Sequence, residues 1–259
     1  MSRVLRDART VFVRESLPGW REPWGHAFGM VQPLVFLGLF GPLLEGVPGM
    51  AGAMPDGAAD AHWQWFVPAI LVMLSLFGTA GTGYTVLTEI QTGAHERMLV
   101  TPMSRHAMLV GRTLKDVQEL LAQAVLIVVV MLPFGFTLHP AGALLGLAML
   151  AVLGVSMGSL SHALAIACRK QQEMFYLVQT SLLFPLVFLS GMMLPLEMGP
   201  GWMRTAGDLN PLTYIVEALR ALFAGRIAEA VVLQGWLVAA ALAVVGVALG
   251  TRAMSRSHT

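Results

Sequence analysis

Charged side chains are scarce in this sequence. Asp, Glu, Lys and Arg make up 12% of the 259 residues, which is about half the share found in a typical soluble domain. Hydrophobic residues make up 56%. The formal net charge is only +1, so no basic excess favours a nucleic-acid partner. This balance excludes an ordinary water-soluble domain and favours a protein whose main solvent is the lipid bilayer.

Lysine and cysteine are almost absent, and several catalytic motifs are missing with them. Lys115 follows Leu114 and Lys170 follows Arg169, whereas the phosphate-binding loop GxxxxGK[ST] needs a lysine after a glycine. The chain therefore cannot bind ATP by that route. HExxH and CxxC motifs are also lacking, and Cys168, the single cysteine, cannot form an internal disulfide. We expect no catalytic residue, no metal site and no bound cofactor in this chain.

Long stretches without any acidic or basic residue are the main positive feature. Crossing the hydrocarbon core takes about 20 apolar residues, and the longest stretch, 120–168, holds two such lengths because prolines and glycines cluster in its middle from Pro133 to Gly142. We predict a single all-α membrane domain over residues 1–259. Its six transmembrane helices are expected at about 24–44, 64–87, 112–134, 141–167, 174–195 and 230–250.

The basic residues are distributed unevenly between the predicted connections. If the N-terminus is cytoplasmic, thirteen of the 16 Lys and Arg residues lie on the inner side, and only Arg204, Arg220 and Arg226 lie outside. The positive-inside rule then places both termini in the cytoplasm. About 22 polar and basic residues precede the first apolar stretch and no small-residue cleavage site follows it, so we expect no cleavable signal peptide. The predicted location is the plasma or inner membrane.

Ionisable side chains are missing from the centres of the predicted spans. Lys115, Asp116 and Glu119 come closest, at the inner entrance of the third span, and we expect them to form an interfacial group that faces water. Proton- or sodium-coupled transporters usually keep an ionisable group near the bilayer midplane. This absence disfavours, without excluding, a secondary transporter.

Two segments outside the spans are predicted to be helical. Residues 3–15 place apolar side chains on one helical face and arginines on the other, as in a helix that lies in the inner headgroup layer. In the cytoplasmic segment 89–105, Gly93 permits a reversal, residues 94–100 form about two helical turns and Pro102 ends them. This segment is interpreted either as an ordinary loop or as a stiff element that docks into a partner's cleft.

The segment 197–229, predicted to face outward, contains a short apolar helix. Asn210 followed by Pro211 is a good helix start, because the Asn side chain accepts backbone amide hydrogen bonds and Pro at the first helical position sacrifices no needed donor. The helix is expected to include Tyr214 and to end near Gly225. With only about 14 residues it can dip into the outer half of the bilayer without crossing it, either as a lid or in contact with cargo.

These two segments carry a resemblance to a known family. Gly93-Ala-His-Glu-Arg-Met-Leu-Val-Thr-Pro-Met-Ser-Arg105 resembles the G-T-x-E-x-L-x-V-T-P-x-S-R signature of ABC-2-type transporter permeases. Asn210-Pro-Leu-Thr-Tyr-Ile-Val-Glu-Ala-Leu-Arg220 resembles their N-P-L-T-Y-x-V-[DE]-A-x-R segment. Ala94 and His95 depart from the threonine and leucine usual in the first motif.

The resemblance implies the ABC-2 (type V) exporter fold, with an N-terminal interfacial helix and outer short helices between spans five and six. It implies a second permease copy, in a homodimer or a heterodimer, and two copies of a cytoplasmic ABC ATPase subunit that bind ATP and Mg. Residues implied to couple to the ATPase are Gly93, His95, Glu96, Arg97, Leu99, Pro102 and Arg105. Residues implied in the structure or gating of the outer segment are Asn210, Pro211, Tyr214, Glu217 and Arg220, of which the last two can pair one helical turn apart.

The implied function is ATP-driven export of an amphiphilic drug, antibiotic or lipid-like molecule. The chain has 17 methionines and three tyrosines. Methionine-rich walls adapt to varied apolar molecules, whereas a sugar conduit more often offers aromatic faces. A lipid-linked polysaccharide permease and a non-transporting membrane anchor or assembly subunit remain as alternatives.

Overall fold

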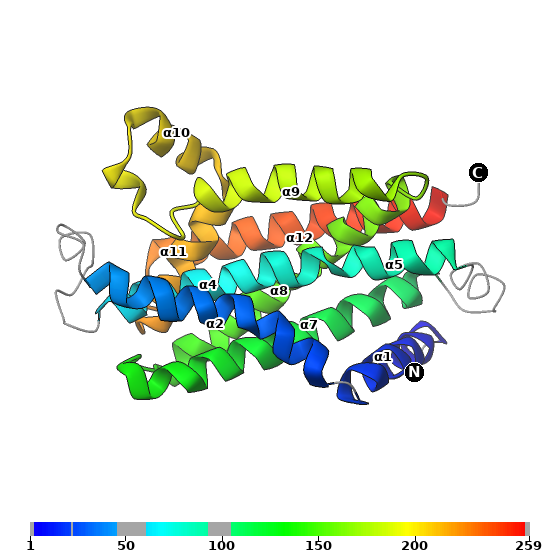
Figure 1. Ribbon diagram of the computed structural model, residues 1–259, viewed down its shortest axis with the longest axis horizontal. Helices are drawn as coiled ribbons and strands as arrows, with labels where there is room; N and C mark the ends of the chain where they lie inside the picture. Colours follow the sequence, from blue (N-terminus) through cyan, green and yellow to red (C-terminus); the bar gives the residue numbers. More distant parts are fainter. Residues whose placement is uncertain (1–2, 22, 46–60, 93–104, 257–259) are drawn as a thin grey trace.

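The structure is a computed structural model that describes residues 3–21, 23–45, 61–92 and 105–256. Within these ranges every regular element is a helix and none is a strand (Figure 1). The long helices are α1 (Arg3–Arg21), α2 (Pro23–Glu45), α4 (Ala61–Ala80), α7 (Arg105–Met131), α8 (Pro140–Ala167), α9 (Gln172–Phe188) and α12 (Ala230–Arg256), and the ten-residue α5 (Thr82–Gln91) follows α4 directly. The shorter ones are η1 (Leu132–Phe134), η2 (Leu196–Met198), α10 (Gly201–Leu209) and α11 (Pro211–Phe223).

Four helical stretches in the described ranges are long and apolar enough to cross a membrane. Their bounds are His62–Gln91, Met108–Phe134, Pro140–Ala167 and Ala230–Ala253. Helices α2 and α9, which coincide with the predicted first and fifth spans, do not meet the same criterion of length and hydropathy in their described parts. The all-helical class is thus confirmed, together with four membrane-capable helices.

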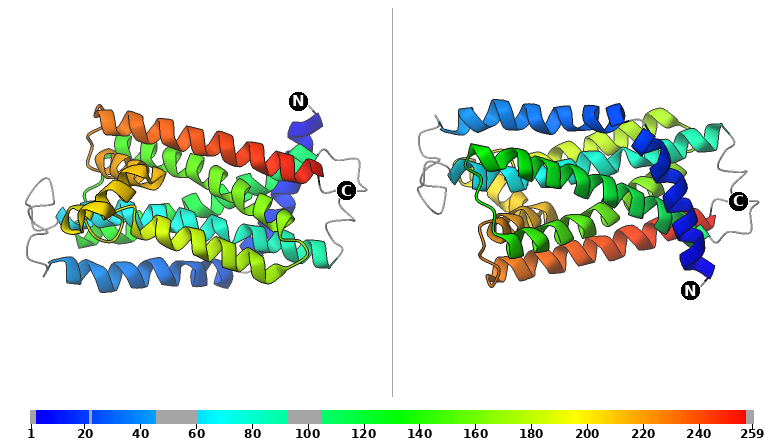
Figure 2. Two further views of the ribbon diagram at one scale, coloured as in Figure 1. Left: turned by 90° about the horizontal axis from the view of Figure 1, so that it is seen from above. Right: turned by 90° about the horizontal axis from the view of Figure 1, so that it is seen from below.

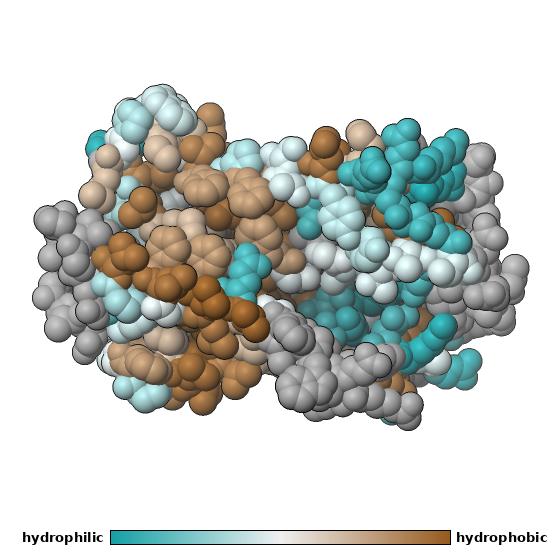
Figure 3. Space-filling view, in the orientation of Figure 1, coloured by the Kyte–Doolittle hydropathy of each residue, from teal (hydrophilic) through white to brown (hydrophobic). Residues whose placement is uncertain are grey.

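The long helices run roughly along one axis of the molecule, as Figures 1 and 2 show. Both chain termini lie at one end, together with the last turn of α5 and the first turn of α7, while α10 and α11 lie at the other end. Hydrophilic side chains gather toward the end with the termini, and hydrophobic ones cover much of the remaining visible face (Figure 3).

Helix α1 crosses the bundle end instead of extending it (Figure 2). It is longer than the predicted 3–15, and its apolar face packs on α7, where Ala8 and Val11 are buried. A Cβ atom on Gly111 would lie 2.7 Å from the Cβ of Val11 and 2.8 Å from the carbonyl oxygen of Ala8. Part of the face predicted to contact headgroups therefore contacts protein.

The predicted second span lies within one membrane-capable helical stretch, His62–Gln91, which has a local irregularity at one residue. Helix α4 ends at Ala80 and α5 begins at Thr82, with Gly81 between them. The Thr82 hydroxyl donates to the Thr79 carbonyl at 2.7 Å, and the Gly83 amide donates to Ser161 Oγ on α8 at 3.0 Å. Because a Cβ on Gly83 would collide with Ser161, only glycine permits this close crossing. The predicted span 64–87 did not include this irregularity between α4 and α5.

The predicted turn in the long apolar stretch is confirmed. After η1, Gly135 adopts a left-handed conformation with φ of 94°, and α8 starts at Pro140. His139 Nδ1 lies 3.1 Å from the carbonyl oxygen of Phe223, which fixes the turn to the end of α11. The positive φ explains the need for a glycine at this corner.

Small residues bring the long helices close together. A Cβ atom on Gly246 of α12 would lie 2.6 Å from the carbonyl oxygen of Ser156 on α8, and one on Gly250 would lie 3.1 Å from that of Ser159. Helices in lipid gain little from the hydrophobic effect and associate through close van der Waals packing, which small residues allow. The core of the protein therefore forms around α8, with α4, α7, α11 and α12 packed on it.

Candidate functional site

The predicted coupling residues Gly93, His95, Glu96, Arg97, Leu99 and Pro102 lie outside the described residues, and Arg105 is described only as the first residue of α7. The structure describes the two helices that flank them. Helix α5 ends at Gln91, and the hydroxyl of its capping residue Thr92 donates to the Thr88 carbonyl at 3.0 Å. These two flanks lie at the end of the molecule that also holds both termini (Figure 1).

A buried arginine joins the two flanking helices. Arg112 on α7 has a side-chain exposure of 6%, and its Nη2 atom is hydrogen-bonded to Glu89 Oε2 near the end of α5. The same nitrogen lies 4.0 Å from Glu15 Oε1 on α1. We call Arg112, Glu89 and Glu15 the Arg112 network. Since charged hydrogen bonds are short and strong, the Arg112–Glu89 bond holds α5 against α7, and the 4.0 Å contact with Glu15 adds a weaker electrostatic link to α1.

A second polar group lies deeper along α7. Lys115 forms an ion pair of 2.8 Å with Glu119, and both side chains are 25% exposed. Asp116 is different: its side chain is 4% exposed, its Oδ1 is 3.8 Å from Lys115 Nζ, and its Oδ2 is 3.8 Å from Nε2 of the buried His162 on α8. The expectation of a water-facing group at this place is therefore wrong for Asp116, whereas Lys115 and Glu119 are partly exposed.

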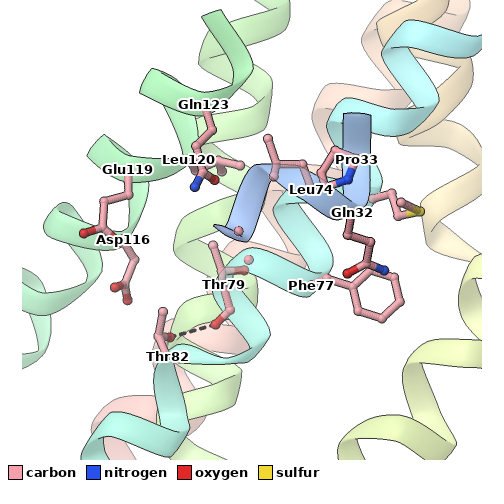
Figure 4. Close-up of a pocket in the computed structure, with 13 residues that line it drawn as sticks. Gln32, Pro33, Leu74, Phe77, Thr79, Thr82, Asp116, Glu119, Leu120 and Gln123 are labelled. Carbon is pink, nitrogen blue, oxygen red and sulfur yellow. Dashed lines mark hydrogen bonds between the residues drawn. The ribbon is translucent and has the colours of Figure 1, made fainter. Parts of the chain in front are cut away.

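A cavity of about 250 Å³ adjoins this polar group between α2, α4, α5 and α7. Figure 4 shows α7 on one side of it, carrying Asp116, Glu119 and Gln123, and α4 and α2 on the other. Its polar lining residues are Gln32, Thr79, Thr82, Asp116, Glu119 and Gln123, and its apolar ones include Met73, Leu74, Phe77 and Leu120.

The spacing of α7 carries the signal that sequence reasoning missed. Arg112, Asp116, Glu119 and Gln123 follow one another at intervals of four, three and four residues, which places them on one helical face. A polar stripe that continues into an apolar stretch indicates a polar interior between helices. Counting charges per span, as the sequence analysis did, hides that stripe.

At the other end of the molecule the predicted helix start of α11 is confirmed. Asn210 is the N-cap: its Oδ1 accepts from the Leu212 amide at 3.0 Å, and its Nδ2 donates to the Leu186 carbonyl of α9 at 2.7 Å. Pro211 occupies the first helical position. The Tyr214 hydroxyl donates to the Asp208 carbonyl at 2.8 Å and so links α11 to α10. Asn210 thus caps one helix and holds another.

Arg220 connects this outer segment to two parts of the chain that are distant in sequence. Its Nε donates to the Trp65 carbonyl at 2.9 Å and its Nη2 to the Gly191 carbonyl at 3.0 Å. The guanidinium carbon lies 3.8 Å from the centre of a Trp65 ring, a cation–π contact. Glu217 is exposed. The sequence prediction of a local Glu217–Arg220 pair did not foresee these contacts with α4 and with the loop after α9.

Helix α11 is wedged among the long helices. Leu212, Ile215, Val216, Ala218, Leu219, Ala221, Leu222 and Phe223 are all buried. A Cβ on Gly142 of α8 would collide with the Leu222 carbonyl, and one on Gly235 of α12 would collide with the Ala218 side chain. A short helix held this tightly at one end of a bundle can seal that end.

Comparison with known proteins agrees with the helical architecture. The sequence profile of the family described as ABC-2 type transporter matches residues 6–224. The chain is 28% identical over 201 residues to the daunorubicin resistance ABC transporter permease protein DrrB1 of Streptomyces coeruleorubidus, an alignment that covers 76% of this chain and 67% of that relative.

Two further relatives are also described as permeases. The putative transport permease ycf38 of Porphyra purpurea is 26% identical over 240 residues, covering 90% of this chain and 80% of the relative. The probable multidrug ABC transporter permease YbhR of Escherichia coli strain K12 is 22% identical over 167 residues, covering 63% of this chain and 45% of the relative.

Proposed function

Because this chain belongs to the ABC-2 type transporter family, we propose that it is the permease subunit of an ATP-driven exporter for amphiphilic molecules such as drugs, antibiotics or lipids. The chain itself supplies the membrane path, and a separate cytoplasmic ABC ATPase subunit, present in two copies, binds ATP and Mg. A second permease copy, identical or related, completes the complex.

The proposed topology has six spans with both termini in the cytoplasm. The distribution of basic residues supports this orientation, and the position of both termini at one end of the bundle supports an even number of spans (Figure 1). Helix α2 has 23 residues, a rise of about 35 Å, which suffices to cross. Helix α9 has 17, about 26 Å, so residues beyond Phe188 must complete its crossing of a hydrocarbon core of about 30 Å.

The Arg112 network is the observation that carries the proposal. A segment that receives force from an ATPase must be connected rigidly to the helices that move. Arg112 connects both flanks of the segment 93–104 through a buried charged bond, with the amphipathic α1 as a third member. In this proposal His95, Glu96, Arg97 and Leu99 contact the ATPase, and Gly93, Pro102 and Arg105 set the turns around them.

The outer segment is proposed as the external gate. Asn210 and Arg220 connect α11 to α9, α4 and the loop at Gly191, so a movement of those spans moves α11 with them. Pro211, Tyr214 and Glu217 belong to the same short helix. Opening of this end then follows from rearrangement of the spans when the two ATPase subunits close.

Co-purification tests the coupling part of the proposal. The chain is isolated from its native cells in mild detergent, as wild type and as the double variant Glu96→Ala, Arg97→Ala. We expect a soluble ATPase in equal amount with the wild type and its loss from the double variant. The matched control Arg252→Ala removes a cytoplasmic-end charge outside the segment and should retain the ATPase. An ATPase that remains with the double variant would contradict the role of this segment.

Transport by reconstituted vesicles separates the permease from its alternatives. One relative is named for daunorubicin resistance and another as a probable multidrug permease, which supports an amphiphilic cargo. ATP-dependent movement of a fluorescent amphiphile by the complex is the expected result. A complex that contains the ATPase and moves neither amphiphiles nor lipid-linked glycans is the result expected of an anchoring subunit.

A further inference from the structure

The charged groups in and around the cavity beside α7 include more carboxylates than cations. The charged groups connected by contacts in this region comprise two cations, Arg112 and Lys115, and four carboxylates, those of Glu15, Glu89, Asp116 and Glu119. Arg112 is hydrogen-bonded to Glu89, and Lys115 lies 2.8 Å from Glu119 and 3.8 Å from Asp116. An uncompensated carboxylate is costly in a poorly solvated interior.

Asp116 carries most of this excess. Its side chain is 96% buried, since only 4% is exposed, and its Oδ2 atom has no hydrogen-bond partner. The 3.8 Å between Oδ2 and Nε2 of His162 is too long for a hydrogen bond. Figure 4 shows the Asp116 carboxylate on the face of α7 toward Thr79 and Thr82, where it lines the cavity.

The opposite wall of the cavity is apolar. Met73 and Leu74 are 3% exposed, and the aromatic ring of Phe77 lies beside Gln32 in Figure 4. Methionine and aromatic side chains accept varied apolar shapes, and an aromatic face also attracts a cation. A buried carboxylate whose Oδ2 atom accepts no hydrogen bond lies on one side, and this apolar wall lies on the other. The two match a molecule with a positive group and an apolar body.

We propose that this cavity binds the ammonium group of an organic cation, with Asp116 and Glu119 as its counter-ions and Met73, Leu74 and Phe77 in contact with the adjoining apolar part. The volume of about 250 Å³ lies below the range of about 300–1,000 Å³ that is usual for whole drug-sized ligands. The site therefore holds the cationic end of its ligand, and the remainder extends between α2 and α7. The interpretation of this cavity as a substrate site rests on the proposed export function, whereas the binding of an organic cation to it does not.

Two sources could supply this ammonium group: a soluble amphiphilic amine or the headgroup of an ethanolamine phospholipid. Both offer a primary ammonium, which in the lipid is separated from the apolar chains by a phosphate group. They differ in whether the ligand arrives from solution or from the inner leaflet, and the composition of the surrounding bilayer distinguishes them.

Equilibrium binding to the full chain in phosphatidylcholine nanodiscs, without any ATPase, tests the site. The probe is dansylcadaverine, a fluorescent primary amine, and the matched neutral probe is its N-acetyl derivative, which keeps the fluorophore and linker. We expect the wild type to bind the amine at least about tenfold more tightly than the acetylated compound, a difference of about 1.4 kcal/mol. Asp116→Asn should remove most of that preference, and Glu119→Gln should reduce it.

Glu173→Gln provides the control, because it removes an exposed carboxylate on α9 outside the cavity and should leave the preference unchanged. If Asp116→Asn does not elute as the wild type does, Glu119→Gln and a Phe77→Leu variant replace it in the comparison. Addition of phosphatidylethanolamine to the nanodiscs should weaken probe binding if the lipid headgroup is the natural occupant, and should leave it unchanged if a soluble amine is.

Equal binding of both probes by the wild type would overturn the proposal, as would an unchanged amine preference in Asp116→Asn. Either result would mean that His162 or a proton compensates the Asp116 charge without a ligand. The binding experiment contains no nucleotide and no ATPase. A negative result there would therefore not contradict the export function, which the transport experiment tests. Selective amine binding without a co-purifying ATPase would conversely support the site and contradict the exporter.

Discussion

Arg220 shows how one side chain connects three parts of this chain. Its guanidinium donates to carbonyl oxygens of Trp65 and Gly191 and stacks on the Trp65 ring. Gly191 has a φ of 68°, so its carbonyl is oriented by a conformation that favours glycine. Arginine suits this place because its planar fork has five N–H donors and stacks on aromatic faces.

We predict that Arg220→Lys destabilises the protein by about 2–3 kcal/mol, in line with the contribution of hydrogen bonds that involve a charged group. Lysine keeps the charge but cannot donate in the same fork geometry, so one of the two carbonyls loses its partner. The measurement is the midpoint temperature at which the detergent-purified chain loses its monodisperse elution peak. We expect that temperature to fall by several degrees.

Arg226→Gln is the matched control for this prediction. Arg226 pairs with Glu229 at 3.1 Å, and both side chains are 41% exposed, a setting in which ion pairs contribute about 0–1 kcal/mol. Its midpoint temperature should stay near that of the wild type. Equal midpoints for Arg220→Lys and Arg226→Gln would show that the contacts with Trp65 and Gly191 do not stabilise the fold.

Residues that act locally could be predicted from sequence, and residues that act at a distance could not. Asn210 and Pro211 start a helix through bonds to their own neighbours, which the sequence displays. Arg220 contacts Trp65, a residue 155 positions away, and Asp116 is buried because α8 brings His162 beside it. Without the packing of helices distant in sequence, a buried aspartate and a water-facing one look alike.

Helix α11 holds its place through close backbone contacts. Gly142 and Gly235 let α8 and α12 approach it closely, since a side chain at either position would collide with α11. In lipid, such packing replaces the hydrophobic effect as the source of helix association. The short helix is therefore fixed on both sides as well as at its two ends.

We predict that Gly142→Ala lowers the stability of the protein by about 1–3 kcal/mol, the usual effect of overpacking. The added methyl group meets the backbone carbonyl of Leu222, which cannot move away as a flexible side chain could. The same midpoint temperature reports the loss.

The control for this prediction is Gly38→Ala in α2, where a Cβ atom meets nothing within 4 Å. Alanine favours the helix there by about 0.5–1 kcal/mol, so this variant should be as stable as the wild type or more so. Destabilisation of both variants by the same amount would assign the effect to the loss of glycine and not to contact with α11.

Proline and glycine predicted the end of a helix only where several of them lie close together. The cluster from Pro133 to Gly142 predicted the corner between α7 and α8. The glycines Gly78, Gly81 and Gly83 did not lead to a predicted irregularity between α4 and α5, because they lie inside a long apolar stretch without a proline beside them. The bounds of the nine-residue helix α10 were not predicted from the sequence.

The whole chain is expected to cross the membrane three times between Thr92 and Thr205. Helices α7, α8 and α9 lie between these two exposed positions, and α9 is shorter than a usual span. In a Cys168→Ser background, we predict that a membrane-impermeant maleimide labels Thr205→Cys in intact cells and labels Thr92→Cys only after permeabilisation.

Labelling of both cysteines in intact cells would place them on one side and remove α9 from the set of spans. Labelling of Thr92→Cys alone would invert the orientation that the basic residues predict. Cys168 is the only cysteine in the sequence, so a single substitution supplies the unreactive background in which both positions are compared.

Helix α5 extends from the irregularity at Gly81 toward the cytoplasmic-end segment that is proposed to contact the ATPase, so a rotation of this helix would be largest at its far end. Its ten residues span about 15 Å, with the fulcrum near Gly83, where Ser161 holds the chain. A rotation of about 10° about Gly83 would displace Gln91, which is about 12 Å away along the helix, by about 2 Å. Glu89, near the end of α5, is hydrogen-bonded to Arg112 on α7, and Asp116 lies one turn further along α7 at the cavity. A displacement of α5 would therefore be transmitted along α7 to the cavity wall, without rearrangement of the tightly packed core around α8.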